Sequence, residues 1–446
     1  MKNRQRWIHP GWVLLLVLLS GCVQKSYPAA HIKEALSEIC RKEYGIEEMD
    51  VKIAGNTIGV YLPLKKLFAA DFKEAAITGK VRNLETLFEP SPEALEKVED
   101  VLFSISRVIL STDRAFEFYV LEATDVEKTG MQLVLTGYVN DIKRVRIWDI
   151  SRNEYRKRVI HELRLNRAVL WQRPVHEFFR DIETLSPEKI KQKYFNKGVS
   201  ADVLQDLFLS SLIGKSGIKK SWRVMDMRSI AVQQSEGLVY AKLQIDNGKN
   251  EPTELQYLFL VTLNDEQARI IRIIPFQYRD DAGGMQKIPF PKDLQIQENL
   301  DQWEQEFPLQ EVKLGVFLAE QLTRRVQALM SGDERIQNTF RDIKLHFDYK
   351  EDPVKPYFSL AIEASLKEFN HYNRTSLIFH EDMLYLLNLA SREFVEVLRS
   401  YQFGSYEYLR LNVAQEISPW KIAREDLELF RRKKVDLQGL LTIPKI

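Results

Sequence analysis

The chain has 446 residues, of which 45% are hydrophobic and 28% charged, and its formal net charge is +1. A chain of this length is too long for one ordinary core, so its length predicts two or three folded domains. The nearly neutral charge provides no field that would attract a strongly charged polymer, and nucleic acid is therefore not expected as a partner.

The N-terminal stretch has the pattern of an export signal. Lys2, Arg4 and Arg6 form a positive segment, an apolar run covers residues 12–19, and Leu19-Ser20-Gly21-Cys22 follows directly. The apolar run is far shorter than the roughly 20 residues that a membrane-spanning helix needs. The pattern therefore predicts a signal that is removed after use.

Leu19-Ser20-Gly21-Cys22 resembles the lipobox of bacterial lipoproteins. The resemblance implies a diacylglyceryl thioether on Cys22, cleavage of residues 1–21, and acylation of the new N-terminus. Several acyl chains hold a protein stably at a membrane, so residues 22–30 would form a lipidated tether. Val23 stands where enteric bacteria read an Asp as an inner-membrane retention signal, which favours the periplasmic leaflet of an outer membrane if the organism has one. The alternatives are an ordinary secretory signal with a chance cysteine, and an uncleaved anchor.

The second cysteine has no partner if the first carries lipid. The sequence contains only Cys22 and Cys40, so no intramolecular disulfide could form even in an oxidising envelope. Cys40 lies on the apolar side of a helical pattern over residues 31–41, which predicts a buried, inert thiol.

Residues 31–180 are predicted to form a first α+β domain. Gly55-Asn56 lies between two alternating apolar runs and predicts a hairpin, because tight reversing turns need positive φ. Ser91-Pro92-Glu93 predicts a helix start, with a hydroxyl cap, a proline in the first turn and an acid near the positive end of the dipole. The predicted helices are 31–41, 91–110 and 151–165, and the predicted strands are 49–54, 57–62, 116–123 and 131–139. Residues 64–88 form an amphipathic stretch that is broken by Gly79.

Residues 181–278 are predicted to form a central domain of helices followed by an antiparallel meander. The predicted helices are 187–195 and 201–213, and the predicted strands are 222–232, 238–245, 253–263 and 268–276. This order resembles the nuclear-transport-factor-2-like (cystatin-like) fold. That fold hosts both pocket enzymes and structural modules, so it does not fix a function.

Residues 279–311 are predicted to be a linker, and residues 312–446 a third module with the element order of the first. Its predicted helices are 312–330, 381–399 and 419–432, and its predicted strands are 340–349, 357–364 and 406–413. Two matches favour duplication: Phe116-Glu117-Phe118 with Tyr406-Glu407-Tyr408, and Asp149-Ile150-Ser151 with Glu416-Ile417-Ser418. The first copy is expected to have one extra strand, over 131–139. The alternative is that two unrelated α+β layers share an element order. The predicted fold class is α+β, with helices on mostly antiparallel sheets.

Cationic residues concentrate around the predicted helix 151–165. A cluster near a membrane could attract anionic headgroups. The alternative is a solvated helix face, partly neutralised by Glu154 and Glu162. The cluster consists of Lys143, Arg144, Arg146, Arg152, Arg156, Lys157, Arg158, Arg164 and Arg167.

The sequence predicts no catalytic residue, metal site or cofactor. It contains no histidine pair at the i, i+4 spacing that places two imidazoles on one helix face for zinc, and no Gly-x-Ser-x-Gly elbow. Aromatic residues of the central strands could line a pocket, with His176 as its polar group. The alternative for the aromatic residues is an ordinary core. The candidate lining residues are Trp222, Tyr240, Tyr257, Phe259 and His176.

The leading functional hypothesis is a lipid-anchored envelope protein that acts as a non-catalytic scaffold or binding component and contacts other envelope proteins. The alternative is a small-ligand carrier or hydrolase-like enzyme that uses the concave face of the central sheet. A cavity plugged by side chains, with an apolar patch outside, would favour the first hypothesis, and an open cone with converging polar groups the second.

Overall fold

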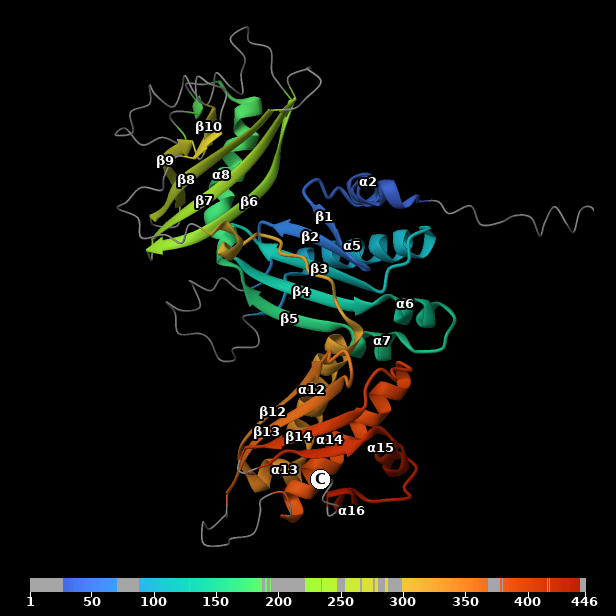
Figure 1. Cartoon of the computed structure of the whole chain (residues 1–446). Helices are drawn as coiled ribbons and strands as arrows, with labels where there is room; N and C mark the ends of the chain where they lie inside the picture. The colour runs from blue at the N-terminus through green and yellow to red at the C-terminus, as the bar shows by residue number, and fades with distance from the viewer. Residues whose placement is uncertain are drawn as a thin grey trace, which may run out of the picture. The chain divides into compact units, whose positions relative to one another are not determined.

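A computed structural model of the chain has two compact units (Figure 1). The first comprises the chain up to Tyr155 together with His161–Gln310, and the second comprises Arg156–Ile160 and Glu311–Ile446. Both combine helices with sheets, which confirms the predicted α+β class. The predicted signal peptide and Cys22 lie outside the described residues. These are 27–69, 88–127, 129–186, 189–190, 193, 221–233, 235–246, 253–264, 267–275, 277–279, 285–287, 299–367, 378, 380–414, 416 and 418–441.

The first sheet of the first unit has the strand order β1-β2-β3-β4-β5. Its strands are β1 (Asp50–Ala54), β2 (Thr57–Leu64), β3 (Phe118–Asp125), β4 (Met131–Tyr138) and β5 (Ile160–Leu165). The neighbours β2 and β3 run parallel, whereas β1–β2 and β3–β4 are antiparallel pairs. The predicted hairpin at Gly55-Asn56 is confirmed, and Gly55 has a φ of 53°.

Two helices of this unit pack on each other, α2 (Ile32–Tyr44) and α5 (Pro92–Ser111). The predicted helix start is confirmed, because the Ser91 side chain accepts a hydrogen bond of 3.2 Å from the Ala94 amide. The sulfur-bearing side chain of Cys40 is buried between these elements, and its burial raises the pKa of the thiol. The prediction of a buried free cysteine is thereby confirmed.

The region after β4 differs from the prediction. It contains α6 (Val139–Arg146), α7 (Arg152–Arg158) and then β5, so the single helix predicted over 151–165 is wrong beyond Arg158. Pairing at the edge of the sheet outweighs the weak helical preference of the charged sequence after Ile160, because strand formation depends mainly on tertiary context.

The second sheet of the first unit is an antiparallel meander. Its strands follow chain order: β6 (Ser221–Gln233), β7 (Glu236–Asp246), β8 (Thr253–Asn264) and β9 (Gln267–Pro275). All four predicted strands are confirmed, while most of the two helices predicted before them lies outside the described residues. One long helix, α8 (Arg167–Thr184), packs on one face of this sheet (Figure 1). A short hairpin follows, formed by β10 (Gln277–Arg279) and β11 (Met285–Lys287).

The residues before the second unit pack against the first. Trp303, just after the one-turn helix η3 (Leu300–Gln302), is buried beside Leu238 and Tyr240 on the face of the meander opposite α8. We call residues 303–309 the strap. Glu304 exchanges two backbone hydrogen bonds with Ser229 of β6, at 2.8 and 2.9 Å. This part of the predicted linker 279–311 is therefore an ordered component of the first unit.

The second unit contains a four-stranded sheet in the order β12-β13-β14-β15, with β13 parallel to β14 and the outer pairs antiparallel. The strand β15 corrects two predictions. The second copy does have a fourth strand, and the helix predicted over 419–432 is a strand followed by a helix. The elements are α12 (Leu314–Gly332), α13 (Glu334–Thr339), β12 (Phe340–Lys350), β13 (Tyr357–Leu366), α14 (Glu381–Ser400), β14 (Tyr408–Val413), β15 (Trp420–Ala423), α15 (Arg424–Arg431) and α16 (Leu437–Leu441).

The first four strands of the first unit and the sheet of the second unit share order and direction, and the agreement extends to single hydrogen bonds. The amide of Glu117 donates to Asn56 O at 2.9 Å, and its carbonyl accepts from Val139 at 2.8 Å. Glu407 makes the same two bonds, to Pro356 O at 2.8 Å and from Arg424 at 3.0 Å. The predicted match of Phe116-Glu117-Phe118 with Tyr406-Glu407-Tyr408 thus occupies equivalent positions.

The second predicted match is wrong. Ser151 caps α7 through a 3.0 Å hydrogen bond to its hydroxyl from the Glu154 amide. The equivalent place before α16 is taken by Asp436, whose carboxylate accepts from the Gly439 amide at 2.7 Å. The residues that correspond to Asp149-Ile150-Ser151 are therefore 434–436 and not Glu416-Ile417-Ser418.

Candidate functional site

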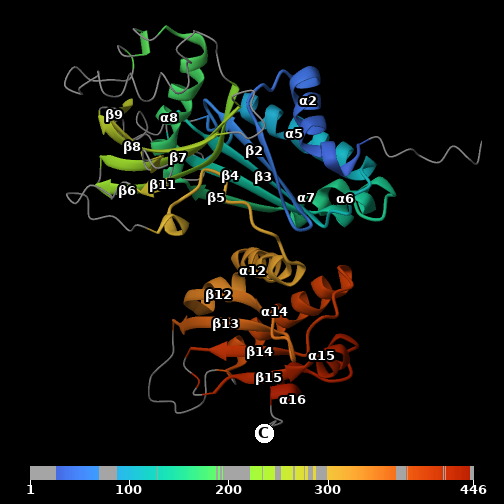
Figure 2. The same cartoon turned by 45° about the horizontal axis from the view of Figure 1, so that its top comes forward.

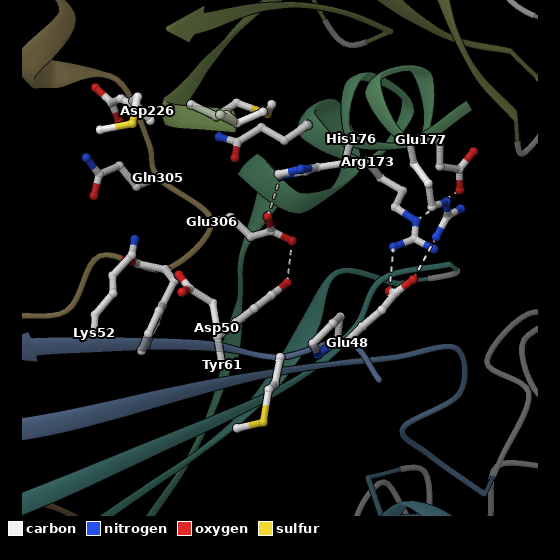
Figure 3. Close-up of a pocket in the computed structure, with 18 of the residues that line it drawn as sticks. Glu48, Asp50, Lys52, Tyr61, Arg173, His176, Glu177, Asp226, Gln305 and Glu306 are labelled. Atoms are coloured by element: carbon white, nitrogen blue, oxygen red, sulfur yellow. Dashed lines mark hydrogen bonds and ion pairs between the residues drawn. The ribbon is translucent and has the colours of Figure 1, made fainter. Parts of the chain in front are cut away.

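A cleft of about 520 Å3 opens in the first unit between α8, the β1–β2 hairpin, β6 and the strap. His176 and Arg173 enter it from α8, Tyr61 from β2, and Glu306 from the strap (Figure 3). The cleft thus joins four stretches that are far apart in the sequence.

Glu306 lies at the centre of the polar contacts of the cleft. Its Oε2 is 2.8 Å from Nε2 of His176, and its Oε1 accepts a hydrogen bond from the Tyr61 hydroxyl (Figure 3). Burial by itself would raise the pKa of Glu306, but the charge and hydrogen bonding of His176 and the Tyr61 hydroxyl outweigh it. The pKa of Glu306 therefore lies below its ordinary value, and the carboxylate is ionised at neutral pH. Burial, followed by the facing Glu306 carboxylate, raises the pKa of Tyr61 far above its ordinary value, so its hydroxyl stays protonated and donates.

A second charged group lies at the rim of the cleft. Glu48 contacts two arginines of α8: Oε1 is 2.6 Å from Arg180 and Oε2 is 3.7 Å from Arg173. Arg173 also pairs with Glu177, one turn further along the helix, at 3.0 Å. These charges neutralise one another and connect α8 to the residues just before β1 (Figure 3).

Backbone contacts hold the strap in place under the cleft. Lys52 Nζ donates to Phe307 O at 2.9 Å, and the Asn166 side-chain amide donates to Glu306 O at 2.8 Å. The Phe307 ring stacks on Tyr61 with centroids 5.7 Å apart. Gly59 lies so close to Leu309 that an added Cβ would come within 2.6 Å of its side chain, so the strap packs directly on β2 at this position. The position of the Glu306 carboxylate is therefore fixed by the contacts of the strap as well as by His176 and Tyr61.

A further acid, Glu122 of β3, is buried beside Tyr61, with which it pairs across β2 and β3. Its Oε2 has no hydrogen-bond partner within the described part of the chain. Burial raises the pKa of Glu122 to about 7, and the nearby Arg164 and Lys52 only partly oppose this. Glu122 is thus a buried carboxyl that can take up a proton near neutral pH.

The structure separates the residues predicted to line one pocket. Tyr257 and Phe259 lie in the core between the meander and α8, whereas Tyr240 lies on the opposite face beside Trp303. His176 alone is in the cleft. Trp222 is the second residue of β6, and its side chain lies outside the described set, as does Cys22.

The charged side chains of the cleft define the kind of ligand that it suits. Its acids and bases face one another in pairs, and it presents both signs of charge on a fixed frame, which suits a polar, charged ligand. Across the described residues, no group of three or more His, Cys, Asp or Glu side chains could hold a metal ion. Sequence reasoning missed Tyr61 and Glu306, since one is part of an apolar strand and the other lies in a stretch without periodicity.

No protein-family model, curated protein or solved structure matched the chain. None of the described helices combines the length and apolar character required to cross a bilayer.

Proposed function

We propose that the chain is a lipid-anchored protein of the bacterial cell envelope that acts as a non-catalytic binding component and contacts other envelope proteins. The lipobox ending in Cys22 supports the anchor. With several acyl chains, attachment would be close to permanent.

The observation that carries the binding role is the filled face of the meander. Phe178 and Phe179 of α8 pack edge-on against Phe259, with ring centroids 5.9 and 5.6 Å apart. Trp171 of the same helix lies so close to Gly237 of β7 that an added Cβ would come within 2.4 Å of its ring. Aromatic side chains thus fill the face of the meander that α8 covers. This filling supports a structural role for the meander and argues against an open ligand-binding cone on this face.

Two measurements test this proposal. Growth with an alkyne fatty acid should label the wild-type protein and leave a Cys22→Ser variant unlabelled and unprocessed. Crosslinking in native membranes, followed by capture of the acylated protein, should then recover the same envelope proteins in repeated experiments. Absence of the label contradicts the anchor, and absence of a reproducible partner contradicts the binding role.

A second candidate function rests on the cleft. Its volume and its paired charges around His176 and Glu306 suit a small ligand that carries both charges, such as a short peptide. Zwitterionic tripeptides should then raise the unfolding temperature of the wild type and fail to do so for His176→Gln. Equal shifts for both proteins would exclude this use of the cleft.

A further inference from the structure

The turn after α6 exposes two large apolar side chains. Ile147 is 73% and Trp148 is 87% exposed. Trp148 has a φ of 61°, in the left-handed region that favours glycine. These two adjacent apolar side chains lie outside the core, and the turn that carries them is strained.

The backbone of this turn does not require apolar residues. The amides of Trp148 and Asp149 donate to Val145 O at 3.1 Å and Arg144 O at 2.9 Å, which is the pattern that closes many helices. In the second unit, the amides of Lys433 and Lys434 make the same two bonds after α15, and Lys433 has a φ of 57°. The equivalent of Ile147-Trp148 is therefore Arg432-Lys433, and a fully charged pair satisfies the same geometry.

Exposed cations flank the two apolar residues in the sequence. Lys143 and Arg146 of α6 and Arg152 of α7 are exposed, and none of them forms an ion pair within the described residues. The acid next to the turn, Asp149, is already neutralised by Arg144 at 2.5 Å. The surface around Trp148 thus carries excess positive charge.

The turn lies at the end of the first unit where the predicted anchor enters. The amide of Tyr27, the first described residue, donates to Ser111 O at the end of α5 at 3.4 Å. A few residues after Ser111, the chain enters β3 at Phe118. Phe118 pairs with Tyr138, which is the residue directly before α6. The two views agree that the start of α2 and the α6–α7 connection lie on the same side of this unit (Figures 1 and 2). The five residues from Cys22 to Tyr27 span at most roughly 18 Å, so a lipid on Cys22 would lie close to this end.

We propose that the Ile147-Trp148 turn inserts into the headgroup region of an anionic bilayer. This inference rests on the proposed lipid attachment, because the tether brings this end of the unit to the membrane. Tryptophan favours the membrane–water interface, and lysine and arginine attract anionic headgroups. The acyl chains would hold the protein at the surface, and the turn would set its orientation there.

Flotation of the mature chain without its lipid (residues 23–446) tests this inference, because Cys22 then plays no part. The chain should float with vesicles of phosphatidylcholine mixed with phosphatidylglycerol, weakly with phosphatidylcholine alone, and less in high salt. Ile147→Arg with Trp148→Lys copies the turn of the second unit and should weaken binding roughly tenfold or more. Each of Lys143→Glu and Arg146→Glu should weaken it by roughly fivefold or more.

The exposed loop of the second unit provides a matched control. Val354 is 78% exposed and is followed by an exposed lysine, so Val354→Arg with Lys355→Glu changes the same kinds of side chain elsewhere. This control should float like the wild type, and all variants should unfold at the same temperature. Absence of flotation with anionic vesicles, or equal flotation of the turn variant, overturns the proposal. Self-association that the turn variant abolishes, without vesicle binding, would instead assign the turn to a second copy and also overturn it.

These outcomes are independent of the test of the anchor. Fatty-acid labelling at Cys22 can succeed when flotation fails, which leaves a lipoprotein whose turn does not touch the membrane. Flotation can succeed when labelling fails, which leaves membrane contact without a covalent lipid.

Discussion

The β1–β4 part of the first sheet and the β12–β15 sheet share strand order and direction but differ in how many faces they bury. In β13, burial alternates, so that Phe358, Leu360 and Ile362 face the core and the residues between them are more exposed. In β2, every residue except Pro63 is buried, because the strap covers the second face. The same sheet arrangement can therefore leave one face exposed to solvent or bury it beside a cleft. Which of the two occurs depends on whether a distant segment of the chain covers that face.

The covering segment also explains where polar groups accumulate. The equivalents of Tyr61 and Glu122 in the second unit are Ala361 and Asn412, which pair with each other across β13 and β14. Neither is charged, and the second sheet has no counterpart of the strap within its described residues. The buried carboxyl of Glu122 therefore lies where the strap closes the second face of the first sheet, and a substitution there should have effects that depend on pH.

The largest effect is expected from a substitution in a cross-strand pair of the first unit that has a known equivalent in the second. Tyr119 and Gly137 pair across β3 and β4, and Leu409 and Ile422 pair at the same place in the second unit. An added Cβ at Gly137 would come within 2.2 Å of the Tyr119 ring. Gly137→Ile should lower the free energy of unfolding by about 3 kcal/mol or more, measured by urea denaturation.

Tyr119→Leu combined with Gly137→Ile reproduces the pair of the second unit and should recover much of this loss. The recovery is incomplete, because the 2.7 Å hydrogen bond between the hydroxyls of Tyr119 and Tyr155 disappears. A double variant that is as unstable as the single one would show that the two sheets are not equivalent at this position.

The second effect concerns Glu122. Because burial raises its folded-state pKa to about 7 from 4.5, the folded protein holds a proton that the unfolded chain releases. The stabilisation from this proton is complete below pH 4.5 and is lost as pH rises through 7. The free energy of unfolding should therefore fall by roughly 3 kcal/mol by pH 8. Glu122→Gln should remove this part of the pH dependence in denaturation curves from pH 5 to 8. The exposed Glu117→Gln is the control and should leave the curve unchanged.

The third effect concerns Glu306. The pKa of Glu306 is lower in the folded protein than its ordinary value of 4.5. The stabilisation from its ionised carboxylate is therefore present above pH 4.5 and is lost as pH falls through the folded-state pKa. Glu306→Gln should cost roughly 2 kcal/mol at pH 7, since Tyr61 and His176 lose a charged partner. The wild type and the variant should converge in acid. A constant difference from pH 7 to pH 3 would contradict the ionised carboxylate.

The fold could be predicted from the sequence where local signals act alone. The cap at Ser91-Pro92, the Gly55-Asn56 hairpin and the alternation of β6–β9 depend on nearby residues, and all were correct. The strand β15 has only four residues, too few for a period to emerge before the helix that follows. The site could not be predicted from the sequence, because the Tyr61–Glu306 hydrogen bond joins residues 245 positions apart. His176 was the one site residue that could be named, because a histidine stands out by its chemistry alone.

The smallest expected effect separates the backbone of the two turns from their side chains. Glycine adopts a φ near 60° without strain, so Trp148→Gly and Lys433→Gly should each change the free energy of unfolding by about 1 kcal/mol or less, towards higher stability. Equal gains at both positions would show that the turns are the same structural unit. If Trp148→Gly also abolishes vesicle flotation while Lys433→Gly does not, the exposed indole carries a function that stability does not explain. A clear loss of stability for Trp148→Gly alone would mean that the ring supports the fold, and the comparison of the two turns would fail there.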